Sequence, residues 1–279
     1  MLAPRQLVFS ALEGALVDAR TDSFSGAEEA LSELHRRNIP LILLSSRTRA
    51  EIEPVRRKLE HSHPFITENG GGIFFPDGYF NLRIPGGVRV GRYFCIAQGR
   101  PYEEVCEALN EIAGECHVGV TGFRDMNARE ISANTGLRPQ AAELAGDREF
   151  EEPFFFTSAD AAAIGRFVAA ARGRGFDARP GSTFWRFSAG CDTARAVRTV
   201  AQLFRQATRL KLRPAGVGAG DEDLHWVQVM DQAILLSGSR SNEETTSGAP
   251  QIRPQARKVT KIESTGAAGW ARAIFNIIS

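Results

Sequence analysis

The side chains best suited to chemistry follow a short apolar segment, residues 39–44. Ser45 comes directly after it, and Arg47 and Arg49 come next. A serine hydroxyl, together with the N–H groups of the turn after Ala11, has the donors that bind an oxyanion. Arginine binds phosphate or carboxylate through paired hydrogen bonds. We therefore predict an anion site. Two plainer interpretations stay open: Ser45 caps the next turn, and the arginines are ordinary surface residues.

A second group of charged residues follows a glycine-rich turn near the C-terminus. Asp221, Glu222 and Asp223 come directly after residues 214–220. Such carboxylates can hold a cation. They also suit the start of a helix, where the helix dipole favours negative charge. The five histidines have no spacing typical of a metal site or a catalytic triad.

The composition is that of an ordinary globular chain of 279 residues with a formal net charge of +1. This balance gives no reason to expect nucleic acid or a membrane as a partner. No apolar run approaches the roughly 20 residues that span a bilayer. The N-terminal segment lacks the cationic lead of a signal peptide, so we expect a cytoplasmic protein. The four cysteines have no CxxC spacing and are expected to be free thiols.

The elements that must position these side chains alternate between strands and helices. We expect strands over residues 6–10, 39–44, 65–67, 71–75, 214–220 and 233–237, and helices over 26–38 and 192–204. Thr48 and Glu51 have the spacing of a capping box at the start of a further helix. This alternation favours right-handed βαβ units and a parallel sheet.

The rhythm changes after the glycine-rich segment 85–87. Here we expect strands over 93–97, 153–157 and 184–188, helices over 102–113 and 160–171, and two short helices within 121–145. Residues 1–87 and 187–279 are therefore predicted to form one core, with residues 88–186 inserted as a second domain. Such an insertion lies above the carboxyl ends of the strands, where open α/β sheets bind ligands. Residues 238–254 are expected to be a polar loop.

Four segments, in this order, resemble the motif series of the haloacid dehalogenase superfamily of phosphatases. They are LVFSALEGALVD (7–18), LSSRTRAE (44–51), TENGG (67–71) and GVGAGDED (216–223). Within that superfamily the chain resembles the mannosyl-3-phosphoglycerate phosphatase family, through residues 45–51, 135–137, 148–154 and 266–270. The resemblance implies an α/β fold: a Rossmann-like parallel sheet core with an inserted α+β cap domain.

The resemblance also implies catalytic positions, and several have changed here. The nucleophilic aspartate of the first motif is Ala11, and the acid/base aspartate is Glu13. The lysine of the third motif is Thr193. An ungapped alignment places Ala219 at the metal-binding aspartate, whereas a two-residue gap would place Asp221 there. Asp221 and Asp223 are thus the candidate metal ligands, with magnesium expected only if the protein is active.

By the same resemblance, the phosphate and substrate contacts fall on Ser45, Ser46, Arg47, Asn69, Arg148 and Glu152. The last two lie in a cap segment that faces the sugar phosphate in the family. An intrahelical or surface ion pair is the competing interpretation for Arg148 and Glu152.

Three hypotheses follow. The first is a phosphatase-like protein with impaired catalysis that keeps binding of a sugar phosphate or another small anion. The second is an active magnesium-dependent sugar-phosphate phosphatase that uses displaced carboxylates such as Glu13 and Asp221. The third is a protein-interaction scaffold with an empty cleft, whose partner the sequence does not identify.

Overall fold

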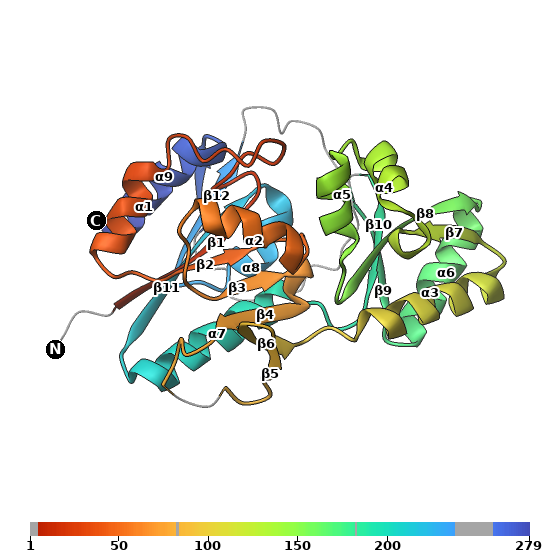
Figure 1. The fold of residues 1–279 in the computed structure, drawn as a ribbon, viewed down its shortest axis with the longest axis horizontal. Coiled ribbons are helices and arrows are strands. Elements are labelled where there is room, and N and C mark those ends of the chain that lie inside the picture. The colour runs from red at the N-terminus through yellow and green to blue at the C-terminus, as the bar shows by residue number, and fades with distance from the viewer. Residues whose placement is uncertain (1–4, 82–83, 182, 238–258) are drawn as a thin grey trace.

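The computed structural model describes residues 5–81, 84–181, 183–237 and 259–279. The chain forms a core, on the left in Figure 1, and a smaller cap on the right. Each has its own apolar cluster and its own sheet. The predicted α/β fold with an inserted cap is confirmed. The predicted loop 238–254 lies outside the described residues.

The core sheet has nine strands in the order β13-β12-β11-β1-β2-β3-β4-β6-β5. Their bounds are β1 Arg5–Ala11, β2 Leu41–Leu44, β3 Phe65–Thr67, β4 Gly72–Pro76, β5 Val88–Val90, β6 Tyr93–Ala97, β11 Leu212–Ala219, β12 Gln232–Ser237 and β13 Val259–Glu263. The pairs from β13 to β3 are parallel, and those from β3 to β5 are antiparallel. The sheet is therefore mixed, where the sequence predicts a parallel one.

Helices cover both faces of this sheet, as expected when strands are buried on both sides. They are α1 Glu28–Arg36, α2 Arg49–Lys58, α7 Thr193–Thr208, α8 Leu224–Val227 and α9 Gly266–Ile278. The predicted capping box of α2 is confirmed, because the Thr48 side chain accepts from the Glu51 N–H and Glu51 accepts from the Thr48 N–H. Trp270 of α9 is fully buried and donates to the Ser10 hydroxyl, at 2.8 Å.

The boundary between core and cap differs from the predicted one at residue 88. β6 pairs with β4 and β5 pairs with β6, so both belong to the core sheet. Phe74 and Tyr93 meet edge to face across this part of the sheet. The cap sheet therefore begins with β7, after the helix that starts at Tyr102.

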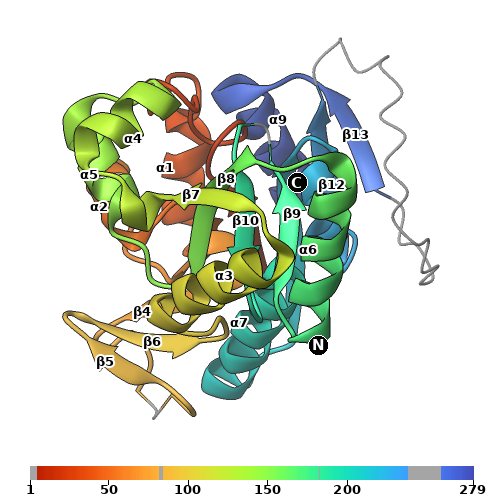
Figure 2. The same ribbon diagram turned by 90° about the vertical axis from the view of Figure 1, so that its right-hand side faces the viewer.

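The cap is a four-stranded antiparallel sheet with helices on one face. Its strands are β7 Gly119–Gly122, β8 Glu151–Ser158, β10 Trp185–Ser188 and β9 Asp177–Pro180, in that order. α3 (Tyr102–Cys116) and α6 (Ala161–Gly173) pack on one face through Phe154, Phe167 and Phe187. They lie in front in Figure 2, on the side away from the core. α4 (Ala128–Thr135) and α5 (Pro139–Gly146) lie at the edge near α2.

No helix among the described residues has the length and apolar character needed to cross a membrane.

Candidate functional site

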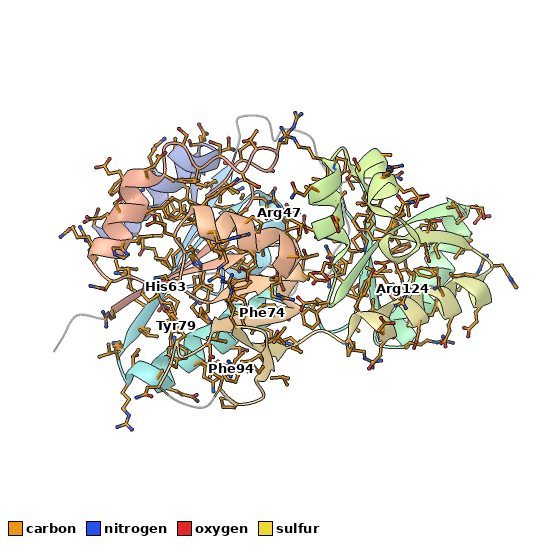
Figure 3. All side chains as sticks on the ribbon, viewed as in Figure 1. Arg47, His63, Phe74, Tyr79, Phe94 and Arg124 are labelled. Atoms are coloured by element: carbon orange, nitrogen blue, oxygen red, sulfur yellow. The ribbon has the colours of Figure 1, made fainter. Side chains whose placement is uncertain are left out.

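A cavity of ≈ 1010 Å³ lies between the carboxyl ends of the core strands and the uncovered face of the cap sheet. Its core side includes Ala11, Glu13, Ser45, Ser46 and Arg47, and its cap side includes residues of β8, β9 and β10. Figure 3 shows Arg47 on the part of the core that faces the cap. The cavity is therefore where the sequence places the ligand site.

Three of the changed positions come together in this cavity. Ala11 ends β1 and is 7% exposed, Thr193 begins α7, and Ala219 ends the neighbouring strand β11. All three line the cavity. Gly70 allows this close packing, because a Cβ atom there would lie 2.5 Å from the Asp192 carbonyl and its φ is +93°. The positions that the resemblance assigns to the nucleophile and the lysine thus line one cavity, where Ala11 presents a methyl group and Thr193 a neutral hydroxyl.

Glu13 is the central polar group of the cavity floor. Ser45 Oγ lies 2.8 Å and 3.0 Å from the two Glu13 carboxylate oxygens, and Arg47 Nε lies 2.9 Å from Oε1. Arg47 also contacts Asp22, at 2.7 Å, and the Ala19 carbonyl, at 3.0 Å. Burial raises the pKa of Glu13 above its ordinary value, although Arg47 and Ser45 act in the opposite direction. Ser45 and Arg47, which were predicted to bind an anion, therefore bind the carboxylate of Glu13.

The turn after Ala11 does not supply the expected free amides at two of its positions. The Leu12 N–H donates to the Leu44 carbonyl, and the Gly14 N–H donates to the Val17 carbonyl. Both groups are used to shape the turn. The predicted cradle of Ser45 and turn amides is therefore largely occupied within the chain.

Asp221 and Asp223 of the acidic segment 221–223 differ in their surroundings. Asp223 lines the cavity, but its carboxylate accepts from the Ala219 N–H and from Trp226 Nε1, both at 2.7 Å. Asp221 has a 78% exposed side chain and lies 3.8 Å from Lys261 Nζ. The described residues contain no group of three or more acidic, histidine or cysteine side chains arranged for a metal. Because Ala11 and Ala219 have no side-chain oxygen, and magnesium is normally bound through one or two carboxylates, these residues do not fit a magnesium site.

Arg148 and Asn69 belong to a buried network that joins core and cap. Glu68 is fully buried and accepts from the N–H groups of residues 149, 150 and 151, at 2.8 to 3.0 Å. Arg148, with a side chain 5% exposed, lies 3.4 Å from both Glu68 and Glu151. Asn69 lines the cavity, and its amide donates to Glu151 at 2.9 Å. Arg148 therefore forms a buried ion pair between cap and core, rather than the expected intrahelical or surface pair, and this arginine does not line the cavity.

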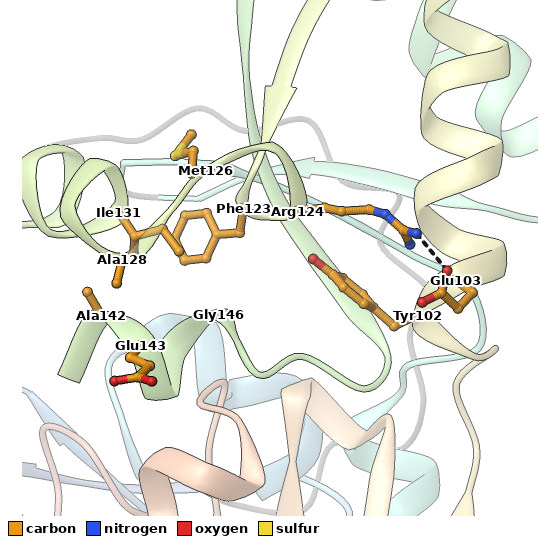
Figure 4. A pocket seen from close by; sticks show the side chains of 10 residues that line it. All are labelled: Tyr102, Glu103, Phe123, Arg124, Met126, Ala128, Ile131, Ala142, Glu143 and Gly146. Atoms are coloured by element: carbon orange, nitrogen blue, oxygen red, sulfur yellow. Dashed lines mark ion pairs between the residues drawn. The ribbon is translucent and has the colours of Figure 1, made fainter. Parts of the chain in front are cut away.

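Glu152 also lies away from the large cavity. It accepts from the Tyr102 hydroxyl at 2.5 Å and from the Arg124 N–H at 3.0 Å. Burial raises the pKa of Glu152 to about 7. Tyr102 and Arg124 border a separate pocket of ≈ 360 Å³, shown in Figure 4, where Arg124 pairs with Glu103. Glu152 thus supports the interior of the cap.

The cap contributes arginines that sequence reasoning missed. Arg179 of β9 and Arg186 of β10 lie directly opposite each other across the antiparallel pair, and both line the cavity. Arg198 of α7 lines it from the core. A strand over 184–188 was predicted, so its alternation could have placed Arg186 on the face opposite the buried Phe187. β9 was not predicted, so the pairing of the two arginines could not be found.

The chain is similar in sequence to known phosphatases over nearly its whole length. A family model described as haloacid dehalogenase-like hydrolase matches residues 8–80. The glucosyl-3-phosphoglycerate/mannosyl-3-phosphoglycerate phosphatase of Methanococcoides burtonii is 30% identical over 274 residues, which cover 98% of this chain and 97% of the relative. That of Persephonella marina is 31% identical over 276 residues, with the same two coverages. The mannosyl-3-phosphoglycerate phosphatase of Pyrococcus furiosus is 29% identical over 229 residues, 82% of this chain and 90% of the relative.

Solved structures resemble the fold of the whole chain. A haloacid dehalogenase-like hydrolase from Bacteroides thetaiotaomicron superposes with a TM-score of 0.59 at 17% identity, covering 98% of this chain and 99% of the other. A sugar phosphatase of haloacid dehalogenase subclass IIB gives a TM-score of 0.59 at 15% identity, covering 98% of both chains. The likeness concerns both core and cap.

Proposed function

This chain belongs to the haloacid dehalogenase-like hydrolase family, and from that premise we propose that it binds a small sugar phosphate without hydrolysing it. The relatives in the comparison are named as phosphatases of glucosyl- or mannosyl-3-phosphoglycerate. Unlike those relatives, this chain is proposed to lack the hydrolysis step. The observation that carries it is that Ala11, Thr193 and Ala219 line one cavity together with Arg186 and Arg198.

Loss of the chemical step follows from charge. The attack of a carboxylate on a phosphoryl group brings two anions together, and cations must stabilise that approach. Ala11 has no nucleophilic atom, and Thr193 has no positive charge. Removing one member of a catalytic unit commonly lowers kcat about 10⁴-fold or more. Glu13 lies two residues after Ala11, and its carboxylate is already bound to Ser45 and Arg47.

Retained binding is supported by the cap arginines. Like charges directly opposite on neighbouring strands repel each other, and a bound anion removes that repulsion. Arg179 is paired with Asp177, whereas neither Arg186 nor Arg198 has an ion-pair partner within the described ranges. A phosphorylated sugar presents the negative charge that these guanidinium groups bind best.

The test measures binding and turnover in the same preparation. Isothermal titration with inorganic phosphate, and with mannosyl-3-phosphoglycerate, should give saturable heat. The same mixtures with magnesium should release no phosphate. Metal-dependent release would instead support the active phosphatase. The absence of both binding and release would support the scaffold, and either result would overturn the proposal. The cytoplasmic location stays a prediction.

A further inference from the structure

The polar groups around Glu13 on the cavity floor offer a ligand mainly acceptors of hydrogen bonds. The single proton of the Ser45 hydroxyl is directed to the Glu13 carboxylate, at 2.8 and 3.0 Å. Each nitrogen of the Arg47 guanidinium has a partner: Glu13, Asp22 and the Ala19 carbonyl. Most donors of Ser45 and Arg47 are therefore engaged within the chain, because three of the five guanidinium N–H groups have these partners.

Acceptors, in contrast, remain available. A carboxylate has about four lone-pair sites, and the Glu13 carboxylate accepts from the single Ser45 hydroxyl, from Arg47 Nε and from its own backbone N–H. The Glu13, Asp22 and Arg47 side chains together carry two negative charges and one positive charge. The floor thus presents negative charge and lone pairs to the cavity, and a group that donates a hydrogen bond fits it best.

We propose that Glu13 is a specificity-determining residue, which makes the cavity accept a phosphate group that carries a proton and reject a fully ionised oxyanion. The P–OH group of such a phosphate donates to Glu13, while its charged oxygens face Arg186 and Arg198 on the other cavity walls. The inference rests on the proposed sugar-phosphate binding. It differs from the acid/base role that the family resemblance gives this position.

The other carboxylates of the cavity lie in different surroundings: Glu151 pairs with Arg148 and Asp177 with Arg179, Asp192 and Asp223 accept from backbone N–H groups, and Glu222 is exposed. Glu222 and Asp192 repel any anion, and the arginines attract any anion. Sulfate and inorganic phosphate have similar size and shape. At about pH 7 phosphate still carries a proton that it can donate, because its ionisation is incomplete there, whereas sulfate carries none. A difference in affinity between phosphate and sulfate therefore measures the effect of Glu13 as an acceptor, and not the effect of the overall charge of the cavity.

The experiment is isothermal titration of the full chain at about pH 7 with inorganic phosphate and with sulfate. The parent is compared with Glu13→Gln, which removes the charge at nearly constant shape, and with Glu13→Ala, which also removes the bulk. Glu222→Gln is the matched control, because it removes a carboxylate of the same cavity that contacts neither Ser45 nor Arg47. Thermal melting checks that each variant is folded.

The parent and Glu222→Gln should bind phosphate at least about tenfold more tightly than sulfate, since a buried charge opposes the anion that has no donor. Both Glu13 variants should lose this preference, mainly by binding sulfate more tightly. Equal binding of the two anions by the parent, or an unchanged preference in a folded Glu13 variant, would overturn the inference while leaving anion binding intact. Binding of neither anion by any variant would overturn the proposed function itself.

Discussion

Two acidic side chains, Glu13 and Glu68, lie on neighbouring parts of the core and are held in different ways. Glu68 is fully buried, and three backbone N–H groups at the start of β8 donate to it. Glu13 has a side chain 22% exposed and is held by two other side chains. Backbone donors move only with the fold, whereas side chains can rotate. The difference teaches that Glu68 fixes the cap on the core, whereas Glu13 belongs to a cluster of side chains on the floor of the cavity, where a ligand can reach it.

Among the tests of this difference, the removal of Glu68 should have the largest effect on the free energy of unfolding. Glu68→Ala leaves three N–H groups without their acceptor and the buried Arg148 guanidinium without one of its two carboxylates. We expect a loss of about 3–5 kcal/mol in the free energy of unfolding, measured by urea denaturation. Glu13→Ala is the matched comparison and should cost about 1 kcal/mol or less, as for a solvent-accessible ion pair. Similar losses in the two variants would remove the distinction.

A third carboxylate, Glu152, is also buried, but it forms no ion pair among the residues that the structure describes. Its pKa is raised to about 7 in the folded chain, so folding favours the protonated form. The stabilisation is complete below the unfolded value of about 4.5 and is lost as the pH rises through about 7. The loss is on the order of 3 kcal/mol. Glu152→Gln should remove this pH dependence, measured by denaturation from about pH 4.5 to pH 8, whereas the exposed Glu143→Gln should keep it.

Asp223 tests whether an acidic group in the cavity acts like Glu68 or binds a metal. Its two carboxylate bonds close the turn after β11. Asp223→Ala should therefore cost about 1–3 kcal/mol of stability, and the exposed Asp221→Ala should cost close to nothing. Titration of the parent with magnesium should show no tight site. Micromolar magnesium binding that disappears in either variant would mean that the carboxylates serve a metal.

The smallest expected effect is that of restoring the nucleophile alone. Ala11→Asp places a second carboxylate near Glu13 without a lysine or a metal to balance it. The repulsion raises the pKa of the new group and weakens it as a nucleophile. We expect no phosphatase turnover from this variant, and expect rescue to need at least Thr193→Lys and Ala219→Asp as well. Phosphate release from an aryl phosphate by the single variant would show that turnover needs neither Thr193→Lys nor Ala219→Asp.

Much of the core could be predicted because its signals are local. The apolar run at 39–44 and the spacing of Thr48 and Glu51 each depend on neighbours in sequence, and both predictions are confirmed. The order of motifs also predicted that Ala11, Thr193 and Ala219 meet.

The remaining features depend on partners distant in sequence. Residues 93–97 form the predicted strand, but only pairing with β4 decides that the strand belongs to the core. Arg148 has a substrate-facing role by resemblance, yet its buried partner Glu68 lies in another segment. β9 is short and carries the charged residues Asp177 and Arg179, so it has no apolar pattern that could have predicted it.

The most direct test of the central claim is the rate of phosphate release by the unmodified protein with magnesium. Mannosyl-3-phosphoglycerate and a generic aryl phosphate serve as substrates, beside an active relative under the same conditions. We predict no release above background, because Ala11 has no nucleophilic atom and the residues around it do not fit a magnesium site. Magnesium-dependent turnover at an ordinary enzymatic rate, about 1 per second or more, would contradict the account.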